Sequence, residues 1–280
     1  MSMLGQRVLT AVVLLALLVP ALFASVDWPF NLLTLLLIGA AGWEWSRLNQ
    51  ADMLPSLVLG GGLALACAAA LAAGWSLSPP ALAWWLAAAV WVFGGALALR
   101  SGPTLWPQLP RLARLSVGLV ALWAAWLAMS HARSIGINFI LSVFCLVWVA
   151  DIAAYFGGRR FGKRKLAPSI SPGKSWEGVY SGLAGVFVLT LAWRATESHI
   201  GTDSLSLFGH LLDHLGLLGG LAALAFLAGM SVVGDLVESL VKRAAGAKDS
   251  SRLLPGHGGV LDRVDALLPV FPLSLALLSL

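Results

Sequence analysis

The sequence predicts an all-α, polytopic integral membrane protein with about nine transmembrane helices. Of its 280 residues, 59% are hydrophobic and only 11% are charged, and the mean hydropathy is +0.87. Apolar stretches recur along the chain, and several approach the roughly 20 residues that cross a bilayer core of about 30 Å. Many of the thirteen tryptophans lie near the ends of these stretches, as interfacial anchors do.

Taken in order, the apolar stretches divide the chain at residue 150. Residues 1–150 are predicted to form N-terminal transmembrane helices, and residues 151–280 a C-terminal transmembrane catalytic region with two charged cytoplasmic loops. The nine predicted spans are Val8–Phe23, Phe30–Trp43, Leu54–Ala73, Pro80–Leu99, Ala113–Met129, Ile135–Ala150, Gly178–Trp193, Leu211–Val233 and Ala266–Leu280. We interpret the first as an uncleaved helix, because no clean signal-peptide cleavage pattern follows it.

The distribution of Lys and Arg between the spans predicts the orientation. With the N-terminus inside, sixteen of these residues fall in cytoplasmic segments and only Arg133 and Arg194 fall on the opposite face. Positive residues are retained on the cytoplasmic side of short loops. We therefore expect the N-terminus and both large charged loops to be cytoplasmic, at a bacterial inner (plasma) membrane. Lipid headgroups or a phosphorylated substrate are the expected partners, and nucleic acid is not.

The last cytoplasmic loop concentrates charge of both signs between two apolar spans. If the eighth span continues as a helix, Asp235, Glu238 and Lys242 lie on one face, because they are three and four residues apart. Asp262 and Asp265 follow at helical spacing where the ninth span starts. Several carboxylates thus converge from two helix ends and a loop, and a charged cluster beside the membrane indicates a functional site.

Carboxylates interleaved with basic residues indicate a metal-dependent phosphate enzyme. Oxygen ligands without sulfur suit Mg²⁺, and Lys or Arg can neutralise the remaining phosphate charge. Glycines in the run His257-Gly258-Gly259 would let the backbone approach phosphate oxygens closely. For any single residue, such as Arg252, a solvated loop position or an ion pair is an equally good interpretation.

The other charged loop, residues 151–178, carries six basic residues. A positive-inside anchor alone would account for several of them. The turn that holds Ser171 and Lys174 is a plausible phosphate contact, although it is not a Walker A loop. Asp151 lies at the predicted end of the sixth span, where it could join the site or pair with a neighbouring Arg.

These two loops resemble the phosphatidate cytidylyltransferase (CDP-diacylglycerol synthase) family. The family pattern runs S-x-apolar-K-R, four residues, K-D, then apolar-P-x-H-G-G-apolar-x-D-R-apolar-D. Its fixed positions match Ser239, Lys242, Arg243, Lys248, Asp249, Pro255, His257, Gly258, Gly259, Asp262, Arg263 and Asp265. The upstream loop resembles AYFxGRxxGKxKLxPxISPxKTWEG, with Gly173 and Ser175 where Lys and Thr are frequent. The resemblance covers the chain from about residue 151.

The resemblance implies an Mg²⁺-dependent nucleotidyltransferase of phospholipid biosynthesis. It would join CTP to phosphatidic acid and give CDP-diacylglycerol and pyrophosphate, in contact with membrane lipids. The implied catalytic residues are Asp235, Asp262, Lys242, Arg243, Lys248 and Asp249. The implied substrate-binding residues are Lys174, Ser171, Ser239, His257, Gly258, Gly259 and Arg263. The implied metal ligands are Asp235 and Asp262 first, then Asp249, Glu238 and Asp265.

Two other functions, and the oligomeric state, stay open at this stage. A CTP-dependent polyprenol or phytol kinase would also join CTP to a lipid, but it would need a general base to activate a hydroxyl. A transporter would place ionisable residues in the middle of its spans, whereas here they gather at span ends. A homodimer is compatible with the sequence, which does not specify one.

Overall fold

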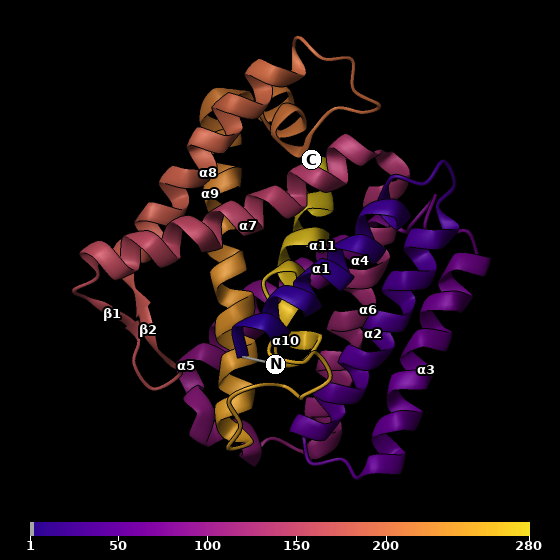
Figure 1. Cartoon of the computed structure of the whole chain (residues 1–280), viewed down its shortest axis with the longest axis vertical. Coiled ribbons are helices and arrows are strands. Elements are labelled where there is room, and N and C mark those ends of the chain that lie inside the picture. The colour runs from indigo at the N-terminus through magenta and orange to yellow at the C-terminus, as the bar shows by residue number, and fades with distance from the viewer. Residues whose placement is uncertain (1–2) are drawn as a thin grey trace.

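The computed structural model describes residues 3–280 and is mostly helical (Figure 1). The elements, in order, are α1 (Met3–Leu22), α2 (Trp28–Leu48), α3 (Met53–Ala72), α4 (Ala81–Ala89), the π-helix η1 (Val90–Gly94), α5 (Gly95–Leu105), the 3₁₀-helix η2 (Trp106–Gln108), α6 (Arg111–Ile135), α7 (Ile137–Phe161), β1 (Lys165–Ala167), β2 (Ser171–Ser175), α8 (Trp176–Glu197), α9 (Leu207–Ala244), α10 (Leu261–Val264) and α11 (Leu267–Leu278). The predicted all-α class is confirmed.

Seven helical segments within residues 3–280 are long and apolar enough to cross a bilayer, so the predicted count of nine is not confirmed. The second predicted span corresponds to α2, which is 21 residues long but carries Asn31, Glu44 and Arg47. The ninth corresponds to α11, whose 12 residues are too few to span a hydrocarbon core. The remaining predicted spans correspond to single segments, with α4, η1, α5 and η2 counted together.

α11 lies inside the protein. Ten of its twelve residues are buried, and it packs against α9, α6, α4 and α7. In Figure 1 this yellow helix passes through the middle of the molecule. A helix surrounded by other helices need not span the bilayer to be apolar on all sides, which explains why its sequence reads as a membrane span.

The closest helix pairs meet through glycines. A Cβ on Gly60 of α3 would lie 2.5 Å from the carbonyl oxygen of Gly39 in α2, and a Cβ on Gly182 of α8 would lie 2.8 Å from that of Ala150 in α7. Close backbone approach of this kind is the usual packing mode of helices in lipid. In the run Gly60-Gly61-Gly62, only Gly60 has a neighbour within 4 Å of an added Cβ.

Two of the helices that carry the charged loops are longer than predicted. α7 continues to Phe161, so Asp151 lies within the helix rather than at its end. α9 continues to Ala244 and therefore carries Asp235, Glu238 and Lys242 as helical residues. Between α7 and α8 the chain forms the antiparallel β1–β2 hairpin, which the sequence did not predict.

Candidate active site

The C-terminal part of α9 presents acidic and basic side chains on one face. Asp235, Glu238 and Lys242 belong to a continuous helix, which confirms the predicted spacing. Ser239, on the next turn after Asp235, donates a hydrogen bond from Oγ to Asp235 Oδ1 (3.2 Å). A Cβ on Gly234 would lie 2.4 Å from the carbonyl oxygen of Asp265, so glycine lets α9 pack directly against the chain that follows α10.

Lys242 joins α9 to α10 by pairing with two carboxylates. Its Nζ lies 2.6 Å from Asp262 Oδ1 and contacts Glu238 Oε2. All three side chains are largely withdrawn from the surface, and Glu238 is 2% exposed. A buried carboxylate needs such a partner, because an uncompensated charge removed from water is costly. The pairing therefore holds Asp262 of α10 against α9, as the spacing of these residues predicts.

Asp262 is also fixed by the loop that precedes it. Its Oδ2 accepts hydrogen bonds from Ser250 N, Ser250 Oγ and Gly259 N, each 2.8 Å long. Burial alone would raise the pKa of the Asp262 carboxyl, but the hydrogen bonds from Lys242, Gly259 and Ser250 lower it to about 2. Asp262 is thus held as an anion in one orientation.

Asp265 differs from Asp262 in its surroundings. It follows α10, and its Oδ1 accepts a hydrogen bond from the Ala266 amide (2.8 Å). Burial, together with the charge of Asp235, raises the pKa of the Asp265 carboxyl to about 7. Two neighbouring carboxylates with pKa values displaced in opposite directions are typical of functional sites.

The β1–β2 hairpin brings the second charged loop to the same place. Lys174 Nζ lies 2.6 Å from Asp235 Oδ2, and Asp151 of α7 interacts electrostatically with both residues. Ser175 ends the hairpin and caps α8 by accepting a hydrogen bond from the Gly178 amide (3.2 Å). The two charged loops therefore meet at α9, through the ion pair between Lys174 and Asp235.

The glycine-containing turn after Leu254 packs around Asp262. Gly258 has a φ of +86°, and a Cβ there would lie 2.6 Å from Asp262 Oδ2, so both its backbone conformation and its surroundings require glycine. Gly259 is buried against Glu44. Arg263 donates a hydrogen bond from its guanidinium to the carbonyl oxygen of His257 (2.7 Å), which fixes the turn to α10.

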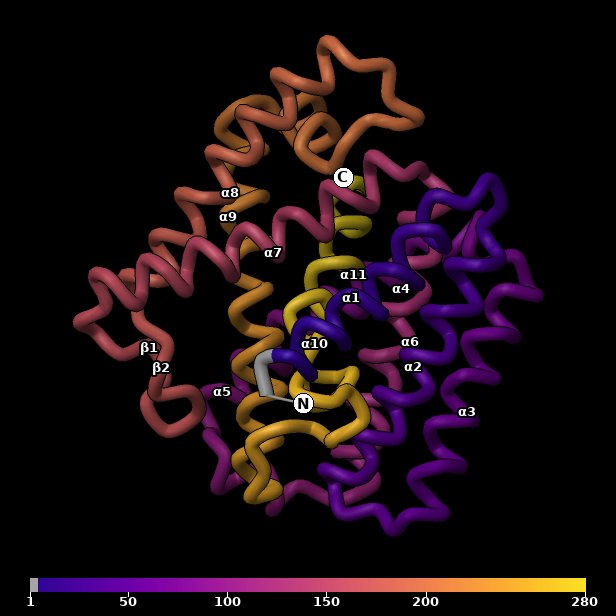
Figure 2. Tube along the Cα trace, in the orientation of Figure 1, coloured from indigo at the N-terminus to yellow at the C-terminus, as the bar shows by residue number. Residues whose placement is uncertain are grey.

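The remaining predicted residues form the rim of this cluster. Arg243 is exposed and donates a hydrogen bond to the carbonyl oxygen of Ile170 (3.3 Å), next to Ser171. Lys248 and Asp249 are exposed in the loop before Ser250. The loop continues past the N-terminal part of α1, where Arg7 and Thr10 donate to the carbonyl oxygens of Gly256 (3.1 Å) and Pro255 (2.8 Å) (Figure 2).

Sequence reasoning missed Glu44 of α2, which is 0% exposed. Its Oε1 accepts from Ser251 Oγ (2.6 Å) and Val260 N (2.9 Å), and its Oε2 accepts from Leu261 N (2.7 Å). The Ser250 hydroxyl lies 3.1 Å from Oε2 and shares its single proton between Glu44 and Asp262. A carboxylate that ends an apolar stretch is the signal that would have identified it. Glu44 ties the loop that holds Asp262 to the N-terminal half of the chain.

The donor chemistry of the cluster fits a hard divalent cation, although the side chains are not yet gathered around one. Among the described residues no three His, Cys, Asp or Glu side chains are already grouped as metal ligands. Instead Lys174 and Lys242 neutralise Asp235, Glu238 and Asp262. Glu238 Oε1 is buried and lacks a hydrogen-bond partner within residues 3–280. An all-oxygen set with an unsatisfied carboxylate oxygen is suited to Mg²⁺.

Comparison with known proteins supports the resemblance seen in the two loops. A protein of Pseudomonas aeruginosa named phosphatidate cytidylyltransferase is 41% identical over 285 residues, which cover 99% of this chain and 97% of that protein. One of Haemophilus influenzae with the same name is 46% identical over 51% of this chain and 46% of its own length. A chloroplastic phosphatidate cytidylyltransferase of Arabidopsis thaliana is 38% identical over 54% of this chain and 34% of its own length. Residues 5–280 match the model of the cytidylyltransferase family, and the chain belongs to that family.

Proposed function

We propose that this enzyme is a phosphatidate cytidylyltransferase and that the cluster around Asp235, Lys242 and Asp262 is its active site. The reaction transfers CMP from CTP to phosphatidate, giving CDP-diacylglycerol and pyrophosphate. A phosphate oxygen of phosphatidate forms a bond to the α-phosphorus of CTP. The bond from that phosphorus to the oxygen bridging to the β-phosphorus breaks, and the electron pair leaves with pyrophosphate. The attacking oxygen is already ionised, so no side-chain nucleophile is required.

The observation that carries this proposal is the partly buried mixture of charges at the meeting point of α9, α10 and β2. Both substrates are anions, so their approach has to be screened and the charge of departing pyrophosphate stabilised. Lys174 and Lys242 are held at the site by carboxylates. Arg243, Lys248 and Arg263 supply further positive charge at the rim. We assign these five residues to the triphosphate and the lipid phosphate, together with Ser171, Ser239 and the His257-Gly258-Gly259 turn.

Mg²⁺ is the cofactor that this donor set favours. Asp235 and Asp262 would hold it, with Asp249, Glu238 and Asp265 as further ligands. A bound divalent cation would neutralise phosphate charge and polarise the α-phosphate. Lys174 and Lys242 pair with these same carboxylates, and with the cation bound their ammonium groups would be available for phosphate oxygens. The carboxylates thus hold the lysines ready in the absence of substrate.

Incorporation of radiolabelled CTP into lipid extract tests the activity and separates it from the alternatives. Purified enzyme should label lipid when phosphatidate is the acceptor and not when a prenol is supplied, and labelling should require Mg²⁺. Labelling of the prenol would indicate a CTP-dependent lipid kinase. No labelling with either acceptor would leave the transporter interpretation, whose test is the flux of an ion or solute across proteoliposomes.

We also propose that the protein lies in a bacterial inner membrane, with the site on its cytoplasmic side. The sixteen-to-two distribution of Lys and Arg supports this orientation, and CTP is a cytoplasmic nucleotide. Gly173 and Arg252 are suitable labelling positions, because both are exposed and a Cβ on Gly173 meets nothing within 4 Å. Ser175 and Ser251 are unsuitable, since they cap α8 and bind Glu44.

Single cysteines at Gly173 and Arg252 should react with a membrane-impermeant thiol reagent only from the cytoplasmic side, in a background lacking Cys67 and Cys145. Gly201 is the matched control, because it is also exposed with open space around a Cβ but lies in the loop between α8 and α9. A cysteine there should react only from the opposite side. Labelling of the Gly173 and Arg252 variants from opposite faces would refute the orientation.

A further inference from the structure

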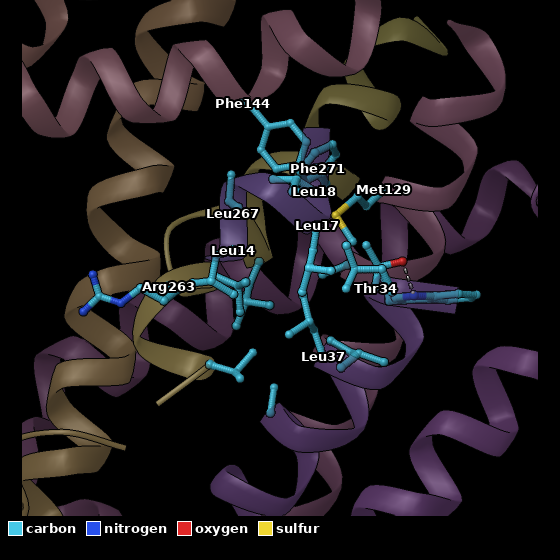
Figure 3. A pocket seen from close by; sticks show the side chains of 18 of the residues that line it. Leu14, Leu17, Leu18, Thr34, Leu37, Met129, Phe144, Arg263, Leu267 and Phe271 are labelled. Atoms are coloured by element: carbon cyan, nitrogen blue, oxygen red, sulfur yellow. Dashed lines mark hydrogen bonds between the residues drawn. The ribbon is translucent and has the colours of Figure 1, made fainter. Parts of the chain in front are cut away.

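An apolar cavity of about 180 Å³ lies beside the charged cluster, between α1, α2, α6, α7 and the α10–α11 segment (Figure 3). Its wall is almost entirely apolar and includes leucines of α1 and α2 and aromatic residues of α7 and α11. The hydroxyl of Thr34 is the polar group of α2 in this wall. It donates to the Phe30 carbonyl oxygen (2.8 Å) and accepts from Trp126 Nε1 (3.2 Å), so it is already satisfied. The cavity therefore offers a surface suited to hydrocarbon.

The short helix α10 separates this cavity from the proposed reaction centre. Val260, Arg263, Val264 and Leu267 line the cavity at the helical spacing i, i+3, i+4 and i+7. Asp262, at a different position of the same turns, points into the charged cluster, where Lys242 binds it. One side of a single turn thus carries the chemistry while another side forms an apolar wall. An α-helix is only about 10–12 Å across with its side chains, so the two environments are adjacent.

One end of the apolar cavity carries a positive charge. Arg263 contributes to the wall, while its guanidinium points away from the leucines in Figure 3. It is held there by the His257 carbonyl oxygen (2.7 Å). A ligand that fills the cavity with an apolar chain would meet a cation at the cluster end. This combination matches an anionic headgroup attached to a hydrocarbon chain.

We propose that this cavity binds one acyl chain of the phosphatidate substrate, whose phosphate reaches the charged cluster past Arg263. The proposal rests on the function proposed above and adds a chain-binding subsite to it. A volume of about 180 Å³ holds about six groups of the size of a water molecule or a methylene, which is part of a long acyl chain. The rest of the chain would lie along α1, where Leu17 lines the cavity and is itself 53% exposed.

Substitution of Leu37 by tryptophan tests the subsite, because Leu37 lines the cavity and its neighbour Leu36 does not. Leu36 is 62% exposed on the same helix, so Leu36→Trp is the matched control. With the full-length enzyme, Leu37→Trp should raise KM for dioleoyl phosphatidate at least fivefold. It should change kcat/KM for dihexanoyl phosphatidate, and KM for CTP, less than twofold. Leu36→Trp should change none of these values more than twofold.

Equal losses on the two lipids, or no loss on either, would overturn the chain-binding role. If Leu37→Trp does not fold, Leu14→Trp in the α1 wall is tested by the same comparison of dioleoyl and dihexanoyl phosphatidate. A wild-type enzyme that converted neither phosphatidate would refute the proposed function instead.

Photolabelling gives a readout that does not depend on turnover. Phosphatidate with a diazirine on one acyl chain should label peptides of α2 and α10, and excess dioleoyl phosphatidate should prevent the labelling. Leu37→Trp should reduce it at least threefold. Equal labelling by a phosphatidylcholine probe would mean that bulk lipid fills the cavity, and this would overturn the proposal.

Discussion

Replacement of Glu44 by glutamine should weaken both the fold and the reaction, because this side chain holds the loop that positions Asp262. Each carboxylate oxygen of Glu44 accepts a hydrogen bond from one backbone amide and contacts one serine hydroxyl, and the Ser250 hydroxyl shares its proton with Asp262. Glutamine keeps the shape but replaces one oxygen with an NH₂ group, which is a donor. One serine and one backbone amide then face a donor instead of an acceptor. The serine can rotate to accept a hydrogen bond, whereas the buried amide cannot.

The hydrogen bonds of Glu44 set the expected loss of stability and activity. A hydrogen bond to a charged acceptor contributes about 1.5–3 kcal/mol, and a buried donor left without a partner costs about 1–3 kcal/mol. With one serine rescued, we expect Glu44→Gln to lower the free energy of unfolding by about 2–4 kcal/mol. Ser250 links Glu44 to Asp262, since its Oγ lies 3.1 Å from Glu44 Oε2 and 2.8 Å from Asp262 Oδ2. Displacement of Asp262 should reduce kcat about 10- to 100-fold.

Glu197 provides the control, because it is also a carboxylate with several hydrogen bonds but is the last residue of α8, next to the start of α9 and far along that helix from Asp235. It accepts from Asn138 Nδ2 (2.7 Å) and from both the amide (2.6 Å) and the hydroxyl (2.9 Å) of Ser206. Thermal unfolding in detergent and CTP incorporation per folded enzyme are the two measurements. Glu197→Gln should lower Tm and leave kcat unchanged, whereas Glu44→Gln should lower both. Wild-type Tm and kcat for Glu44→Gln would refute the reasoning, and equal kcat losses in the two variants would reduce Glu44 to a general structural role.

Four further predictions concern the cluster and a distant cap. Asp235→Asn should remove turnover at every Mg²⁺ concentration while the protein still inserts and folds, and near-wild-type turnover would reassign this residue. Lys248→Ala should raise KM for CTP or phosphatidate without changing Tm, because Lys248 is exposed; unchanged kcat/KM for both substrates would mean a solvation role. Gly258→Ala should lower kcat at least tenfold, because its Cβ would displace the Asp262 carboxylate and its φ is +86°; full activity would show that the turn can adjust. Asp203→Asn should lower stability by about 1 kcal/mol at neutral pH without affecting kcat, since Asp203 accepts from the Ile137 (2.5 Å) and Asn138 (3.0 Å) amides at the start of α7 and is screened by solvent. Burial alone would raise the pKa of Asp203, but these hydrogen bonds lower it. The difference between wild type and Asp203→Asn should therefore persist above about pH 4 and vanish as the pH falls further, and a difference that is the same at all pH values would contradict this.

Local periodicity was enough to predict the α9 part of the site. Asp235, Glu238 and Lys242 are close in sequence and share a helix, so their common face follows from helix geometry alone. The pairing of Lys174 with Asp235 was harder, because it joins residues about 60 positions apart. Charge alone could bring the two loops to one side of a membrane, but the hairpin that aims Lys174 at α9 depends on a short strand pairing that carries no clear sequence pattern.

Glu44 and α11 show what periodicity and hydropathy cannot reveal. The position of Glu44 at the end of an apolar stretch marks it as unusual, but its hydrogen-bond partners lie more than 200 residues away in the sequence, so the sequence does not show what it holds. α11 is apolar enough to be taken for a membrane span, and only its surroundings show that protein rather than lipid covers it. In both cases the deciding partners are distant in sequence, and a single chain without its fold does not specify them.

The position of α10, between the charged cluster and the apolar cavity, explains why so many contacts hold this four-residue helix. Its carboxylate Asp262 is bound by Lys242, its first amides are bound by Glu44, and Arg263 is bound to the turn before it. If the acyl chain lies against the other side of α10, movement of this helix would shift the lipid and the reaction centre together. A reaction between a soluble nucleotide and a membrane lipid requires both to be held in one geometry. Rigid anchoring of the element between them is the direct physical means of achieving this, and it is the reason that we expect Glu44, which touches neither substrate, to affect turnover.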